Sequence, residues 1–224
     1  MEKDNNSSQI KPWAALNWPN RISLLRVLLI APYIVLLLNQ QEPGWEWARH
    51  AALGVFVIMA VSDAIDGLLA RKLDQRTRLG AILDPIADKA LIMCSVVLLS
   101  IPSTAVPGNK LDNWVVVAVV GKDLWVILGF VVIYLVTDRF RVKPTIAGKL
   151  STAGQLVMVV SFLVAPDLNF EGFPLGSHIA RAMAVLVVAL CVLAIISYTR
   201  LGLTFIAQEE KPLDNNGSED HAEQ

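Results

Sequence analysis

Long apolar runs separated by short polar segments dominate the hydrophobic pattern of this chain. Each run is close to the ~20 residues that an α-helix needs to cross the hydrocarbon core of a bilayer. The segments between the runs carry proline, glycine or clustered charges, which are typical of helix ends and loops. The pattern therefore predicts six transmembrane helices, over Ile22–Leu38, Arg49–Leu69, Ala81–Ile101, Trp114–Val136, Ile146–Ala165 and Ile179–Leu201.

The composition favours a membrane protein over a soluble one. Of the 224 residues, 54% are hydrophobic and only 17% are charged, against about 45–50% and ~25% in average soluble chains. We therefore expect an all-α fold, a polytopic bundle embedded in the membrane. The formal net charge of −1 gives no reason to expect a nucleic-acid partner. Cys94 and Cys191 lie inside apolar runs without a CxxC spacing, so we expect buried thiols.

Basic residues alternate from one predicted loop to the next. They are concentrated in the loops after the second and fourth runs: Arg71, Lys72, Arg76, Arg78, Arg139, Arg141, Lys143 and Lys149. By the positive-inside rule, this alternation places these loops and both termini in the cytoplasm. We therefore expect a multi-pass protein of the cell (inner, cytoplasmic) membrane, in contact with membrane lipids.

The pattern also divides the chain into three parts. In residues 1–20, which are polar, Trp13 and Trp18 are placed as interfacial anchors, so either a short interfacial helix or an irregular lead-in precedes the first span. Residues 21–206 form the transmembrane domain. Residues 207–224 are acidic and polar, and we expect a disordered cytoplasmic tail.

Four aspartates stand inside predicted spans, near the cytoplasmic ends of the second and third helices. Asp63 and Asp66 are spaced i,i+3, and Asp84 and Asp88 are spaced i,i+4, so each pair shares a helix face. A carboxylate inside a span costs ~2.5–3.5 kcal/mol on insertion scales and needs a partner or a function. Two divalent cations, Mg²⁺ or Mn²⁺, would neutralise four converging carboxylates and could clamp a pyrophosphate. The alternative is a cluster of salt bridges to Arg71, Arg76, Arg78 and Lys89.

These residues form a longer motif, Asp63-x2-Asp66-Gly67-x2-Ala70-Arg71-x8-Gly80-x3-Asp84-x3-Asp88. It is the same as the signature of the CDP-alcohol phosphatidyltransferases, and the chain is identified as a member of that family by resemblance. The opening Pro19-Asn20-x5-Arg26 is also similar to the family's. The resemblance implies an enzyme that moves the phosphatidyl group of CDP-diacylglycerol to an alcohol and releases CMP. A transporter that uses the aspartates as a cation site is the alternative.

The resemblance also implies a role for each residue of the motif. Metal ions would be bound by Asp63, Asp66, Asp84 and Asp88, and Asp88 would be the general base that takes the proton of the acceptor hydroxyl. The CDP-bearing donor would be bound by Gly67, Ala70, Arg71 and Gly80. The resemblance further suggests a homodimer.

The resemblance leaves the acceptor open between glycerol-3-phosphate and phosphatidylglycerol. Gly121-Lys122-Asp123 and Lys143-Pro144-Thr145-x3-Lys149-x2-Thr152-x2-Gln155 look more like the cardiolipin synthases, which use phosphatidylglycerol. Those enzymes have Arg where this chain has Lys122, so both acceptors remain alternatives. We expect Lys149 and Lys122 to bind an acceptor phosphate, although Lys122 could instead form a neutral pair with Asp123.

Overall fold

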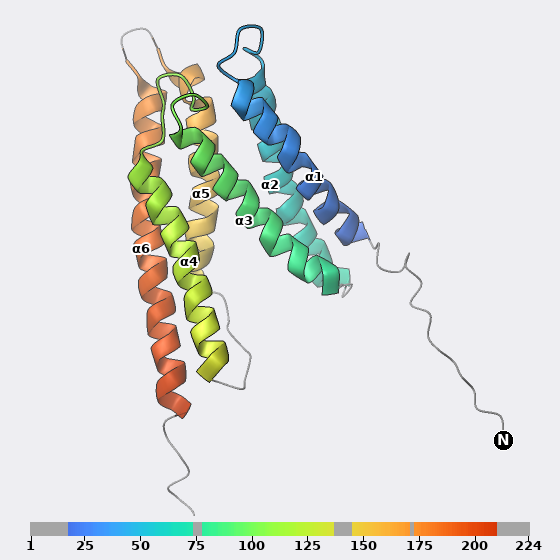
Figure 1. Cartoon of the computed structure of the whole chain (residues 1–224), viewed down its shortest axis with the longest axis vertical. Coiled ribbons are helices and arrows are strands. Elements are labelled where there is room, and N and C mark those ends of the chain that lie inside the picture. Colours follow the sequence, from blue (N-terminus) through green and yellow to red (C-terminus); the bar gives the residue numbers. More distant parts are fainter. Residues whose placement is uncertain (1–17, 74–77, 137–144, 171–172, 210–224) are drawn as a thin grey trace, which may run out of the picture. The chain divides into compact units, whose positions relative to one another are not determined.

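The computed structural model describes residues 18–73, 78–136, 145–170 and 173–209, without the side chains at several helix ends. In these residues the fold is all-helical, with no strand beyond two isolated bridges. Figure 1 shows the elements, which are α1 (Trp18–Asn39), α2 (Ala48–Leu73), α3 (Arg78–Ser100), α4 (Asn113–Val136), α5 (Ile146–Val164), the 3-10 helix η2 (Ala165–Leu168) and α6 (Leu175–Glu209). Each predicted run falls on one helix, so the all-α prediction is confirmed.

The helix ends differ from the predicted runs at both ends of the chain. Trp18, which we assigned to the segment before the first span, begins α1. At the other end, α6 reaches Glu209 and so includes the first residues of the predicted tail. The interfacial helix and most of the tail fall on residues 1–17 and 210–224, outside the described residues, and both stay predictions.

The described residues form two units. The first comprises Met1–Leu111 and Val159–Ile179, and the second Asp112–Met158 and Ala180–Gln224. In the first unit, α1 packs against both α2 and α3. The second unit is built from α4, most of α5 and most of α6.

One buried stripe of α1 holds the first unit together. Arg26, Tyr33 and Leu37 are buried along it, at spacings close to two turns and one turn. The ring of Tyr33 lies 5.8 Å from that of Phe56 in α2. Its hydroxyl lies 2.7 Å from the hydroxyl of Ser95 in α3. Tyr33 therefore joins all three helices, and the stripe below it continues to Arg26.

Two further stripes, on α2 and α3, are buried in this unit. On α2 the buried positions recur every three or four residues, as one helix face requires: Ala48, Ala52, Phe56 and Met59. On α3 they are Leu91, Ile92, Ser95, Val96 and Leu99. Continuing the same spacing along α2 leads to positions 63 and 66, and along α3 to positions 88 and 84, which are the predicted aspartate positions.

The loop between α1 and α2 is bonded to the loop that follows α3. The side-chain amide nitrogen of Gln40 donates to the Thr104 carbonyl oxygen at 2.5 Å, and that of Gln41 donates to the Ala105 carbonyl oxygen at 2.6 Å. Gly44, in the first of these loops, has φ +85°, a left-handed conformation that glycine adopts without a Cβ penalty. These contacts bring the two loops together at one end of the first unit.

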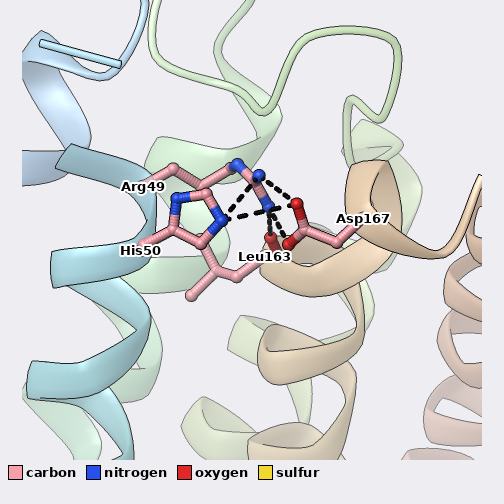
Figure 2. A network of polar contacts seen from close by, with 4 residues as sticks. All are labelled: Arg49, His50, Leu163 and Asp167. Atoms are coloured by element: carbon pink, nitrogen blue, oxygen red, sulfur yellow. Dashed lines mark hydrogen bonds and ion pairs between the residues drawn. The ribbon is translucent and has the colours of Figure 1, made fainter. Parts of the chain in front are cut away.

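A polar network ties the start of α2 to the end of α5 at the same end of this unit (Figure 2). Arg49 donates through Nη2 to Asp167 Oδ1 at 2.6 Å and through Nη1 to Asp167 Oδ2 at 2.7 Å. Its Nη1 also donates to the carbonyl oxygen of Leu163 at 2.6 Å, and His50 Nε2 lies 3.4 Å from Asp167 Oδ1. Arg49 therefore connects the start of α2 to the last turn of α5 and to the 3-10 helix that follows it.

In the second unit, α5 and α6 approach each other closely through glycines. A Cβ on Gly148 would lie 2.5 Å from the hydroxyl oxygen of Tyr198, and one on Gly154 would lie 3.1 Å from a methyl carbon of Leu190. Small residues at a helix contact allow this short backbone separation, which is typical of helices packed in membranes.

Two helical segments are long and apolar enough to cross a membrane among the residues described. They are Ile146–Leu168 and Leu175–Thr204, with mean hydropathies of 1.5 and 2.8. Leu24–Asn39 and Lys89–Ser100 are apolar but shorter. Large apolar side chains are nevertheless exposed on several helices: Leu28 on α1, Val117 and Ile127 on α4, and Leu193 on α6. Such a surface suits contact with lipid better than contact with water.

Candidate active site

Asp63 lies where the buried stripe of α2 continues, one turn beyond Met59. Its carboxylate pairs with Arg26 of α1, because Arg26 Nη1 donates to Asp63 Oδ1 at 2.5 Å. The chain reverses between the two helices, so the side chains meet at matched distances from the turn. The Arg26 side chain is only 1% exposed, whereas that of Asp63 is 43% exposed. A fully packed cation thus holds a carboxylate that remains accessible.

Arg26 is the residue that sequence reasoning missed as a partner. The sequence identifies it only as part of the opening Pro19-Asn20-x5-Arg26, and the alternative of salt bridges to the aspartates names Arg71, Arg76, Arg78 and Lys89 instead. A signal was present, because Arg26 is the one charged residue of the first apolar run, Ile22–Leu38. A charge inside an apolar helix needs an opposite charge nearby, and Asp63 meets that need.

The other predicted metal ligands are placed by helical register alone. Position 66 is on α2, one turn beyond Asp63, and positions 84 and 88 are on α3. By helical spacing, 84 and 88 continue the stripe that includes Ile92 and Ser95, which are buried. Their side chains lie outside the described residues, as do those of Gly67, Ala70, Arg71 and Gly80. Among the described residues there is no group of three metal-binding side chains, and only Asp63 of the predicted four is described.

Lys122 and Asp123 form a sealed pair within α4. Lys122 Nζ lies 2.9 Å from Asp123 Oδ1, and the two side chains are 3% and 6% exposed. Close by on the same helix, Trp125 Nε1 donates to the Thr199 hydroxyl of α6 at 3.0 Å. This arrangement corresponds to the neutral Lys122–Asp123 pair, which is the alternative to a phosphate-binding role for Lys122.

Lys149 is exposed on the first turn of α5, beside Gly148 and its contact with Tyr198. Further along the helix, Gln155 is fully buried, and its amide nitrogen lies 3.6 Å from Cys191 Sγ of α6. Cys191 is buried as expected, and Cys94 is half-buried. Of the two lysines expected to bind an acceptor phosphate, only Lys149 therefore has a side chain open to solvent.

Comparison with known proteins places the chain in a family. The CDP-alcohol phosphatidyltransferase family matches residues 16–206, and the chain belongs to that family. It is 28% identical to the CDP-diacylglycerol–glycerol-3-phosphate 3-phosphatidyltransferase of Aquifex aeolicus (strain VF5) over 194 residues, which are 87% of this chain and 100% of that protein. It is 30% identical to the Bacillus subtilis (strain 168) protein of the same name over 163 residues, 69% of this chain and 80% of that one.

A second kind of relative appears in the same comparison. The chain is 33% identical to the cardiolipin synthase (CMP-forming) of Homo sapiens over 175 residues, which are 71% of this chain and 53% of the human protein. The family resemblance seen in residues 63–88 is therefore confirmed, and the chain is a transferase. Proteins of this family make lipids at membranes and generally depend on a divalent metal ion.

Proposed function

We propose that this protein transfers the phosphatidyl group of CDP-diacylglycerol to the hydroxyl of glycerol-3-phosphate or phosphatidylglycerol. Its family and the names of its relatives support the donor and both acceptors. The observation that carries the proposal is the position of Asp63, on a buried helix stripe with a carboxylate that is 43% exposed. An accessible carboxylate at such a place is suited to binding a cation rather than to packing.

Divalent cations fit what the structure describes of this site. Carboxylate oxygens are the hard ligands that Mg²⁺ and Mn²⁺ prefer. We assign the ligands to Asp63, Asp66, Asp84 and Asp88, because all four positions continue the stripes of α2 and α3 that are buried in a unit where both helices pack on α1. Two such ions, Mg²⁺ or Mn²⁺, would neutralise the diphosphate of the donor and the CMP that leaves.

The protein's own residues then carry the proton and hold the substrates. Asp88 takes the proton of the acceptor hydroxyl, whose oxygen forms a bond to the phosphatidyl phosphorus while the bond from that phosphorus to the CMP oxygen breaks. Gly67, Ala70, Arg71 and Gly80 bind the donor, the small residues leaving room for its approach. CMP departs as the anion, and the proton stays on Asp88 until solvent removes it.

For the acceptor we propose Lys149 as the residue that binds a phosphate. Lys149 is exposed on the first turn of α5. Lys122 was predicted for the same role, but its charge is matched by Asp123 and its side chain is buried. A part for Lys122 in acceptor binding stays a prediction that a lysine-to-glutamine series would test.

We further propose that all six helices cross the cytoplasmic membrane with both termini in the cytoplasm, and that the protein forms a homodimer. The exposed apolar side chains on α1, α4 and α6 and the alternating basic loops support this topology. It places the aspartate positions near the cytoplasmic surface, where a soluble nucleotide can leave.

The proposal is tested by measuring CMP release from the purified full-length chain. CDP-diacylglycerol and Mg²⁺ are supplied with glycerol-3-phosphate or phosphatidylglycerol in separate reactions, and each is repeated with EDTA. We expect CMP release with one acceptor, loss of release in EDTA and recovery with excess Mg²⁺ or Mn²⁺. No release with either acceptor would contradict the proposed reaction, and full activity in EDTA would contradict the metal assignment.

A further inference from the structure

The one carboxylate of the proposed metal site that the structure describes is held from a third helix. Asp63 is on α2, and the other assigned ligands are on α2 and α3, whereas Arg26 is on α1. The Arg26 guanidinium is packed so tightly that 1% of its side chain is exposed. The packing therefore fixes the position of the guanidinium that contacts Asp63. The Asp63 carboxylate, at 43% exposure, is accessible to a ligand on its exposed side.

We propose that Arg26 is a positioning residue that orients the Asp63 carboxylate for a divalent cation. The guanidinium holds Oδ1, and the cation takes Oδ2, for which the described residues supply no partner. This inference rests on the metal assignment made above. Carboxylates that bind metal ions are commonly hydrogen-bonded on their other side, and such bonds fix the direction of the ligand atom.

A second pair in the same unit shows that this geometry is not general. Arg49 uses both terminal nitrogens to bind both carboxylate oxygens of Asp167, in the two-pronged arrangement typical of arginine and carboxylate. Both oxygens of that carboxylate therefore accept a hydrogen bond from the same arginine. Among the described residues, Asp63 is bound at Oδ1 only, whereas both oxygens of Asp167 are bound by Arg49.

A simple counter-charge and a positioning residue predict opposite effects on metal binding. If Arg26 only neutralised Asp63, its removal would take a positive charge away from the site and strengthen cation binding. If Arg26 orients Asp63, its removal lets the carboxylate rotate and weakens cation binding, typically by about 10–100-fold for a lost outer contact. The sign of the change therefore separates the two roles.

The experiment measures Mn²⁺ binding to the purified full-length chain in detergent, without substrate, from the electron paramagnetic resonance signal of the free ion. The variants are Arg26→Gln, Arg26→Lys and Asp63→Asn, with Arg49→Gln as the matched control for losing an arginine–aspartate pair. We expect Arg26→Gln to weaken Mn²⁺ binding roughly 10–100-fold and Arg26→Lys to weaken it less, since a lysine keeps the charge without the planar donor group. Arg49→Gln should bind Mn²⁺ as the unmodified chain does.

A double variant checks that Arg26 acts through Asp63. Once Asp63→Asn is present, Arg26→Gln should change Mn²⁺ affinity no further, because the carboxylate it orients is gone. Unchanged or tighter binding in Arg26→Gln would overturn the inference, and so would a chain that binds no Mn²⁺. If Arg26→Gln does not fold, Arg26→Lys decides by the same criterion. CMP release is a separate readout: weaker Mn²⁺ binding in a chain that releases no CMP would support this inference and contradict the proposed reaction.

Discussion

Replacing Arg49 by alanine should loosen the end of α5 without touching the proposed site. The change removes a two-pronged ion pair to Asp167 and a hydrogen bond to the Leu163 carbonyl (Figure 2). Leu163 is in the last turn of α5, where carbonyl groups lack the usual helical partner. A positive charge there also interacts favourably with the helix dipole. Arg49→Ala therefore removes the side-chain donor of the Leu163 carbonyl oxygen.

The expected loss follows from the exposure of the two partners. The Arg49 side chain is 13% exposed and that of Asp167 is 41% exposed, so solvent screens the ion pair. We assign it about 1 kcal/mol, and the charged hydrogen bond to the carbonyl adds ~1.5 kcal/mol. A total of about 2–3 kcal/mol corresponds to a fall in Tm of roughly 5–10 °C for a chain of this size.

Thermal unfolding in detergent, followed by circular dichroism, measures the effect. Arg49→Lys should recover part of the stability, because a lysine keeps the charge but cannot grip both oxygens. His50→Gln should change Tm little, since His50 is exposed and its nitrogen lies 3.4 Å from Asp167. A Tm for Arg49→Ala within about 1 °C of the unmodified chain would refute the assigned magnitude, and full recovery by lysine would refute the importance of the two-pronged contact.

Three further changes test the rest of the site and the second unit. Asp88→Asn should lower CMP release by about 10²-fold or more while CDP-diacylglycerol still binds, and normal turnover would remove Asp88 as the base. Lys149→Gln should raise the KM for the acceptor about tenfold in steady-state assays and leave the donor KM unchanged, whereas equal effects on both would contradict its assignment. Gly148→Ala should cost about 1–3 kcal/mol in thermal unfolding, because its Cβ would lie 2.5 Å from the Tyr198 hydroxyl. Adding Tyr198→Ala should recover part of that loss, and no recovery would locate the strain elsewhere.

The positions of the helices could be predicted because hydrophobic runs and helices coincide in this chain. Their ends could not, since hydrophobicity says little about polar residues that continue a helix. Trp18 begins α1 although it precedes the first apolar run. Beyond Leu201, α6 continues through further apolar residues and then through Ala207, Gln208 and Glu209, which are good helix formers.

The sequence predicts only those features of the site that follow from spacing along a single helix. The i,i+3 and i,i+4 spacings of the aspartates gave their shared faces, and α2 and α3 are helical over those positions. The pairing of Arg26 with Asp63 joins residues 37 apart and depends on how α1 packs against α2. Nothing in a linear pattern fixes that packing register. The salt-bridge alternative therefore names basic residues near the aspartates in sequence and not Arg26.

Charge pairing inside apolar helices does not by itself distinguish structural from functional carboxylates. Among the described residues, Asp63, Asp123 and Asp167 each face a cation of the protein. Asp123 is sealed with its neighbouring lysine at 6% exposure, and Asp167 has both oxygens bound by Arg49. Asp63 combines an open side chain with a single described partner, on Oδ1. The exposure of the acid and the number of its oxygens already in use therefore separate the three, and they select the one carboxylate that also belongs to the family motif.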